Sequence, residues 1–146
     1  MTSYVLDANI LFSGILSRKP VYRALFSIYT FYPPDFAFIE LEKYRALIQK
    51  KAGADTTQLK EFTLFIFSRL IVVPAYLISD ATRGHAEELV KTIDPKDVAY
   101  VALAEELNAT LLTRDQILHN GLVARGYRKV QLFESFIAEQ IKLGLV

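Results

Sequence analysis

The stretch Tyr4-Val5-Leu6-Asp7-Ala8-Asn9-Ile10-Leu11 begins with three apolar residues after which an acid follows. A short apolar run that ends at a polar residue is typical of a buried strand. Thr110-Leu111-Leu112-Thr113 has the same character and is followed by Arg114 and Asp115. Because ligands of parallel α/β sheets bind beyond the carboxyl ends of the strands, we expect Asp7 and Asp115 at one such edge. An aspartate after a strand also commonly caps a helix, so both interpretations stay open.

Short apolar runs and longer helical segments alternate along the rest of the chain. Further strands are expected at Leu70–Val73 and Lys129–Leu132, and Asp55 with Gln58 resembles a capping pair. Helices are expected at residues 10–16, 20–29, 36–51, 55–69, 80–92, 95–107 and from the last strand to about Leu143. No Asn-Gly hairpin signal joins the strands. The pattern predicts one domain over residues 1–146, an α/β fold arranged as a three-layer α/β/α sandwich around a central, mostly parallel sheet.

Composition excludes several classes of site. The chain has 146 residues, of which 52% are hydrophobic and none is cysteine. Disulfides, thiolate nucleophiles and zinc sites with Cys ligands are therefore excluded. No apolar run approaches the roughly 20 residues of a membrane span, and the N-terminal residues lack a basic leader. We expect a cytoplasmic protein without a membrane segment.

The net charge of +1 gives little long-range attraction to nucleic acid. Three basic groups are visible: Arg18-Lys19, Lys50-Lys51, and Arg125 with Arg128-Lys129. Each of them is better explained as solvated charge at a loop or helix end.

Two further acids stand out from the ordinary surface acids. Glu40 lies within about 40° of Phe36, Tyr44 and Leu47 on the expected helix, whereas Glu42 falls on the opposite side. A carboxylate on a core-facing stripe needs a cation, either Lys or Arg or a metal ion. Asp97 lies in the first turn of its helix, where capping is an equally good explanation.

Asp94 is expected to be the cap of the helix that contains Asp97, because proline follows it in the first helical position. If Asp7, Glu40, Asp97 and Asp115 converge, their repulsion favours a divalent cation. Oxygen ligands favour Mg²⁺ or Mn²⁺, which support phosphodiester hydrolysis. Asn9 and Thr113 would support such a site, and Arg114 would contact a phosphate.

Four motifs in order resemble PIN domains. They are Val5-Leu6-Asp7-Ala8-Asn9-Ile10-Leu11, Pro34-Asp35-Phe36 through Ile39-Glu40-Leu41, Asp94-Pro95-Lys96-Asp97 leading into Val101-Ala102-Leu103-Ala104, and Leu111-Leu112-Thr113-Arg114-Asp115. That family consists largely of metal-dependent ribonucleases and includes the VapC-type toxins of toxin–antitoxin pairs. The resemblance implies metal binding by Asp7, Glu40, Asp97 and Asp115, with RNA as the substrate. It also implies a homodimer and, for a toxin, a small antitoxin that blocks the site.

Other functions fit the sequence less well. A haloacid-dehalogenase-type phosphatase needs an aspartate where Asn9 stands. His85 and His119 occur without a nucleophile elbow or triad pattern and are expected at the surface. A structure-specific DNA nuclease of this kind is usually longer. The main alternative is a PIN-like module that binds RNA or protein and cleaves little, although such a module has no need of a buried acid cluster.

Overall fold

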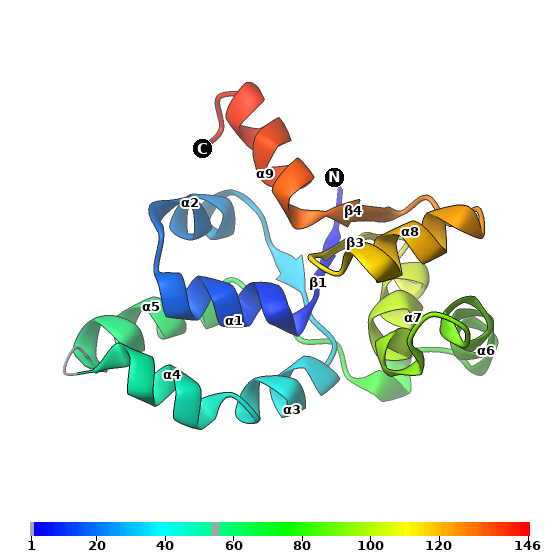
Figure 1. Cartoon of the computed structure of the whole chain (residues 1–146), viewed down its shortest axis with the longest axis horizontal. Helices are drawn as coiled ribbons and strands as arrows, with labels where there is room; N and C mark the ends of the chain where they lie inside the picture. Colours follow the sequence, from blue (N-terminus) through cyan, green and yellow to red (C-terminus); the bar gives the residue numbers. More distant parts are fainter. Residues whose placement is uncertain (1, 54–55) are drawn as a thin grey trace.

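A four-stranded sheet forms the centre of the molecule, and all of its paired strands are parallel (Figure 1). This computed structural model describes residues 2–53 and 56–146. The strand order is β2-β1-β3-β4. The strands are β1 (Tyr4–Leu6), β2 (Phe31–Tyr32), β3 (Thr110–Thr113) and β4 (Val130–Leu132). Because β1 and β3 are neighbours, with Leu6 opposite Leu112, their carboxyl ends lie side by side.

Helices connect the strands and cover both faces of the sheet. They are α1 (Ala8–Ser17), α2 (Pro20–Ile28), α3 (Phe36–Glu42), α4 (Arg45–Ala52), α5 (Thr56–Ser68), α6 (Asp80–Val90), α7 (Val98–Glu106), α8 (Gln116–Ala124) and α9 (Phe133–Lys142). Two 3₁₀ turns, η1 (Ala75–Leu77) and η2 (Pro95–Asp97), precede α6 and α7. Pro20 begins α2 as expected, since its fixed φ suits the first helical position.

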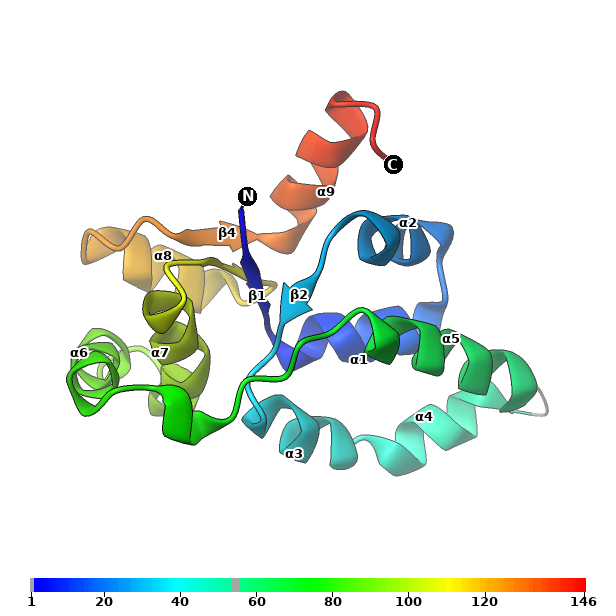
Figure 2. The same ribbon diagram turned by 180° about the vertical axis from the view of Figure 1, so that it is seen from behind.

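The sheet separates two apolar cores because successive strand residues point to opposite faces. Val5 and Leu111 pack with residues of α6, α7 and α8. Leu6 and Leu112 pack with residues of α1, α2, α5 and α9. Figures 1 and 2 show α6, α7 and α8 on one side of the sheet and α1, α2 and α5 on the other. The predicted three-layer α/β/α sandwich is confirmed.

One predicted strand is wrong and one strand was missed. Leu70–Val73 forms no named strand; Leu70 and Val73 make isolated parallel bridges with Phe31 and Pro34. Those bridges run beside β2, which has only two residues and follows α2 closely. Ile71 and Val72 are 49% and 42% exposed, so the apolar run is not a buried strand.

The single helix predicted over residues 36–51 is broken. It ends as α3 at Glu42 and resumes as α4 at Arg45, with Tyr44 at φ −99° and ψ 6°. The ring of Tyr44 stacks on Phe12 of α1, with the ring centroids 4.4 Å apart, so a tertiary contact coincides with the break. As a result Leu47 does not continue the stripe of Glu40 and is 39% exposed. The proposed cap at Asp55 lies outside the described residues.

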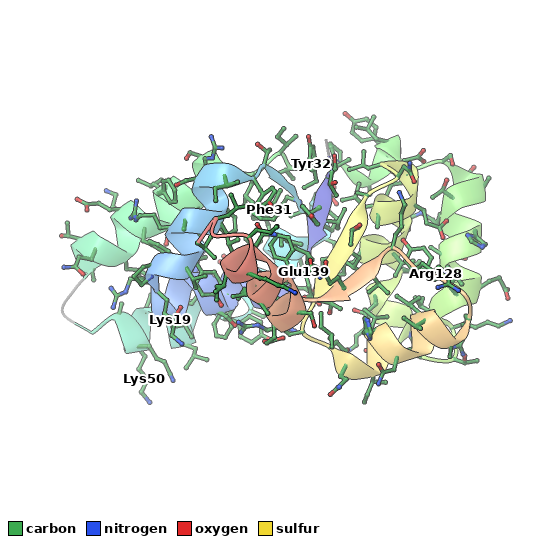
Figure 3. All side chains as sticks on the ribbon, turned by 90° about the horizontal axis from the view of Figure 1, so that it is seen from above. Lys19, Phe31, Tyr32, Lys50, Arg128 and Glu139 are labelled. Atoms are coloured by element: carbon green, nitrogen blue, oxygen red, sulfur yellow. The ribbon has the colours of Figure 1, made fainter. Side chains whose placement is uncertain are left out.

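The basic groups do not form one surface. Figure 3 shows Lys19 and Lys50 toward one end of the molecule and Arg128 toward the other. Lys129 binds the carbonyl and side-chain oxygens of Asn108, and Arg125 donates to the carbonyl of Gly121. The interpretation as solvated charge therefore holds for exposed residues such as Lys19, Lys50 and Arg128, whereas Arg18 is half-buried.

Within residues 2–53 and 56–146, no helix has the length and apolar content needed to cross a bilayer.

Candidate metal centre

The four predicted acids come from four separate segments of the chain. Asp7 joins β1 to α1, and Asp115 joins β3 to α8. Glu40 lies on α3, and Asp97 joins η2 to α7. In Figure 1 the β1–α1 junction lies between α3 and α7, so these connections meet at the carboxyl edge of the sheet. The charges of Asp7, Glu40 and Asp115 all reach Asp97 strongly enough to raise its pKa.

Asp7 is the most buried of the four, with 7% of its surface exposed. Its Oδ1 accepts a hydrogen bond from the backbone N of Asn9 at 2.9 Å, which caps α1. Its Oδ2 accepts one from Oγ1 of Thr113 at 3.2 Å. Burial raises the pKa of Asp7, the two hydrogen bonds lower it, and the charges of Glu40 and Asp115 raise it further. The net pKa of Asp7 lies above the ordinary value. The two hydrogen bonds hold the carboxylate in place, whereas burial and the neighbouring charges disfavour its ionised form.

Thr113 connects the two strand-end acids. The side chain is fully buried, and its hydroxyl accepts a hydrogen bond from the backbone N of Asp115 at 3.0 Å while it donates to Asp7. Oδ1 of Asp115 in turn caps α8 by accepting from the N of Leu118 at 3.0 Å. Both interpretations of Asp7 and Asp115 therefore hold together, because each acid caps a helix and also faces the shared edge.

Glu40 is half-buried and has a partner that the sequence analysis missed. The hydroxyl of Tyr100 on α7 donates a hydrogen bond to Oε1 of Glu40. Burial and this bond raise the pKa of Tyr100, so the phenol stays protonated and remains a donor. Tyr100 lies on the same side of its helix as Asp97, and a buried tyrosine hydroxyl usually needs a partner. That rule was the available signal for this contact.

Asp97 stands at the start of α7, but no side-chain hydrogen bond among the described residues explains its position. Capping is the wrong interpretation, because its side chain makes no capping hydrogen bond to α7. Oδ2 of Asp97 is buried without a hydrogen-bond partner among the described residues. Burial first, and then the charges of Asp7, Asp94, Asp115 and Glu40, raise its pKa to about 7. Asp94, by contrast, accepts from the N of Lys96 at 3.1 Å and is the cap, as predicted.

The two remaining predicted site residues, Asn9 and Arg114, differ in whether their side chains already have partners. Asn9 is exposed, and its side chain makes no hydrogen bond among the described residues, so it is free to bind water near Asp7. Arg114 is already engaged: Nη2 donates to the Tyr22 hydroxyl at 2.8 Å, and Nε lies 3.2 Å from Oε1 of Glu134. Its guanidinium also lies over the ring of Phe133, 5.2 Å from the centroid. These contacts give Arg114 a structural role.

The acids fit a hard divalent cation. An unpartnered buried carboxylate oxygen at Asp97, and the repulsion among the acids, are both relieved by a bound cation. Their donors are all oxygens, which favours Mg²⁺ or Mn²⁺. Among the described residues, no three acidic or histidine side chains already form a chelating group. Mg²⁺ does not require one, since it usually keeps several waters and binds through one or two carboxylates.

The histidines lie apart from this arrangement. Nδ1 of His85 lies 2.8 Å from Glu105, and its side chain is 63% exposed. His119 is half-buried on α8 and contacts Asn120.

Comparison with known families agrees with the geometry. The family model described as PIN domain matches residues 5–134, which include all four acids. No curated protein matches the chain. PIN domains are generally nucleases and typically use divalent metal ions, and the fold found here is a nuclease fold of that kind. The chain belongs to the PIN-domain family.

Proposed function

We propose that this chain is a metal-dependent endoribonuclease that hydrolyses RNA phosphodiester bonds, with residues 1–146 acting as one domain. The catalytic and metal-binding residues are Asp7, Glu40, Asp97 and Asp115. The observation that carries the proposal is Asp97, whose Oδ2 is buried without a partner among the described residues and whose pKa is raised by the charges of the other three acids. A purely structural role does not explain such an arrangement, because an isolated buried carboxylate is destabilising.

The side chains of the proposed site have different roles. Asp7 and Asp97 offer the most desolvated carboxylates for Mg²⁺ or Mn²⁺. When bound there, such a cation would supply water activation and stabilisation of the negative charge that develops on the phosphodiester. Thr113 holds Asp7 in position through its hydroxyl, and Tyr100 does the same for Glu40. Asn9 is placed to orient water, and any phosphate contact of Arg114 requires it to exchange its bond to Glu134.

Cleavage of a mixed RNA pool in Mn²⁺, Mg²⁺ or EDTA tests the proposal. We expect metal-dependent cutting by the wild type and a loss of at least about 100-fold in Asp97→Asn, because a ligand is removed while shape is kept. Asp94→Asn is the matched control, since Asp94 lies three residues earlier and caps η2. Glu42→Gln is the matched control for Glu40→Gln on the same helix.

Each outcome has a defined meaning. Cutting that survives in Asp97→Asn refutes the assigned site. Metal binding seen by calorimetry, without cutting of any RNA, refutes the nuclease activity for the pool tested and favours the binding module considered above. The absence of both metal binding and cutting refutes the metal centre itself.

The toxin role, the homodimer and the small antitoxin are further predictions that rest on the family resemblance. Light scattering of the purified protein measures its mass, and a monomer contradicts the dimer. Growth arrest on expression in a bacterium, relieved in Asp97→Asn, is the expected result for a toxin.

A further inference from the structure

A pocket of about 610 Å³ lies between α3, η1, α6 and the η2–α7 segment, and the residues that line it include chain neighbours of Glu40 and Asp97. Phe36 and Ile39 of α3 line it, and Glu40 follows them directly along the helix. Lys96 and Val98 also line it, one on each side of Asp97 in the chain. Two of the four acids, Glu40 and Asp97, are therefore immediate chain neighbours of residues that line the pocket.

Apolar side chains form much of the pocket wall. Ile78 is buried, with 7% of its surface exposed, whereas Ile39 is 60% exposed. Phe36 and Val98 are half-buried and line the same space. Mostly apolar walls with a few polar groups are typical of sites for small ligands, and this volume is in the usual range.

Arg83 of α6 is the unusual polar group in this wall. Its side chain is half-buried and makes no hydrogen bond, ion pair or ring contact within residues 2–53 and 56–146. The other polar groups of the wall have partners: Oδ2 of Asp35 accepts from the N of Ala75 at 3.1 Å, and Nζ of Lys96 lies 3.8 Å from Oδ2 of Asp94. An unmatched, partly desolvated guanidinium favours an anion.

We propose that this pocket binds one nucleotide of the RNA next to the scissile phosphate. The base packs against the wall formed by Phe36, Ile39 and Val98, and a backbone phosphate binds the guanidinium of Arg83. Single-stranded RNA is recognised by stacking of splayed bases and by charged contacts to phosphate, and this wall supplies both. The guanidinium matches a phosphate in two parallel hydrogen bonds. The inference rests on the ribonuclease function proposed above.

Binding and kinetics of Arg83 variants test the subsite. The probe is a fluorescein-labelled single-stranded RNA of about six nucleotides, measured by fluorescence polarisation in EDTA. We expect Arg83→Ala to weaken binding by about tenfold, as for loss of a charge-assisted contact, and Arg83→Lys to recover part of it. In cleavage assays the effect falls on KM more than on kcat. Arg128→Ala is the matched control, because Arg128 is an exposed arginine that does not line the pocket.

A second variant tests the base-binding wall without changing charge. The side chain of Ile39 is well exposed, so we expect the fold to tolerate Ile39→Ala. We expect it to weaken binding of the intact RNA by about threefold and to leave binding of the same RNA with abasic sites unchanged. Equal losses for intact and abasic RNA overturn the assignment of the wall to a base.

Failure of the subsite is distinguishable from failure of the nuclease. If Arg83→Ala matches Arg128→Ala in both binding and KM, the subsite is refuted while metal-dependent cleavage stands. If the wild type cleaves no RNA but loses binding selectively in Arg83→Ala, the subsite is supported and only the nuclease activity falls.

Discussion

The unpartnered carboxylate of Asp97 affects stability as well as metal binding. Its pKa is raised from an ordinary 3.8 to about 7, so the folded state holds a proton that the unfolded state releases. The ionisation of Asp97 costs the folded state no stability below about pH 4. The loss of stability grows as pH rises and is complete above about pH 7. We expect Asp97→Asn in EDTA to raise the free energy of unfolding above pH 7 by about 1–2 kcal/mol, since solvent screening reduces the effect at a partly exposed group.

Urea denaturation at pH 4 and pH 8 measures this difference. Glu42→Gln serves as the control, because Glu42 is exposed and its charge is not among those that raise the pKa of Asp97. A gain of equal size at both pH values contradicts the raised pKa as its cause.

Tyr100 positions Glu40 without being one of the acids. Tyr100→Phe removes the hydroxyl that donates to Glu40 and keeps the buried ring. Loss of a group that orients a metal ligand typically lowers metal affinity or activity by about 10–100-fold. We expect the affinity for Mn²⁺, measured by calorimetry, and the rate of RNA cleavage to fall together. A loss of stability with metal affinity unchanged indicates that the hydroxyl acts only on the fold.

At the level of elements, Asp115 serves as both a cap and an acid of the site. Asp115→Asn keeps a side-chain oxygen for the N of Leu118, whereas Asp115→Ala removes it. We expect Asp115→Ala to lower the free energy of unfolding in EDTA by about 1 kcal/mol relative to Asp115→Asn. Both variants lose cleavage. Equal stability of the two refutes the capping contribution.

The contact between α1 and α2 depends on a glycine. A Cβ at Gly14 would lie 2.9 Å from Cδ1 of Tyr22, whose buried ring also stacks on Phe133. We expect Gly14→Ala to lower the free energy of unfolding by about 1–3 kcal/mol through overpacking. Gly84→Ala in α6 is the control, since its Cβ meets nothing within 4 Å. Thermal melts of the two variants should shift in opposite directions, because alanine favours an open helical position by about 0.5–1 kcal/mol.

Most elements were predictable from sequence; α8 (Gln116–Ala124) was not predicted although Asp115 caps it, and two other exceptions have a common origin. β1 and β3 follow from continuous apolar runs, and the cap at Asp94 follows from the proline after it. β2 has two residues, too few for any period, and the break at Tyr44 coincides with its stacking on Phe12 rather than with glycine or proline. Contacts between distant residues decide such places, and local pattern does not contain them.

In the candidate site too, local sequence indicates some features, whereas contacts between distant residues determine others. Asp7 and Asp115 were predictable because strand ends are visible in sequence. A buried hydroxyl at Tyr100 indicates that a partner exists, but no local pattern identifies that partner as Glu40, which lies 60 positions away. Arg114 was expected to contact substrate, but its bonds to Tyr22 and Glu134 depend on α2 and α9 packing beside it.

For the whole molecule, metal binding and folding are linked. A cation that binds only the folded state stabilises it by about 2.7 kcal/mol at 100 times its dissociation constant. We therefore expect saturating Mn²⁺ to raise the Tm of the wild type by about 5–10 °C in the absence of RNA. Asp97→Asn should show little of this shift. An equal shift in both proteins places the cation elsewhere.

The double use of Asp7 and Asp115 as helix caps bears on how such a chain can evolve. One nucleotide change in a codon converts aspartate to asparagine, which keeps the acceptor oxygen that begins the helix. The same change removes a negative charge from a crowded set of acids. Descendants of this protein could therefore lose the proposed catalysis while their fold is maintained, and purifying selection for structure alone would not preserve that chemistry.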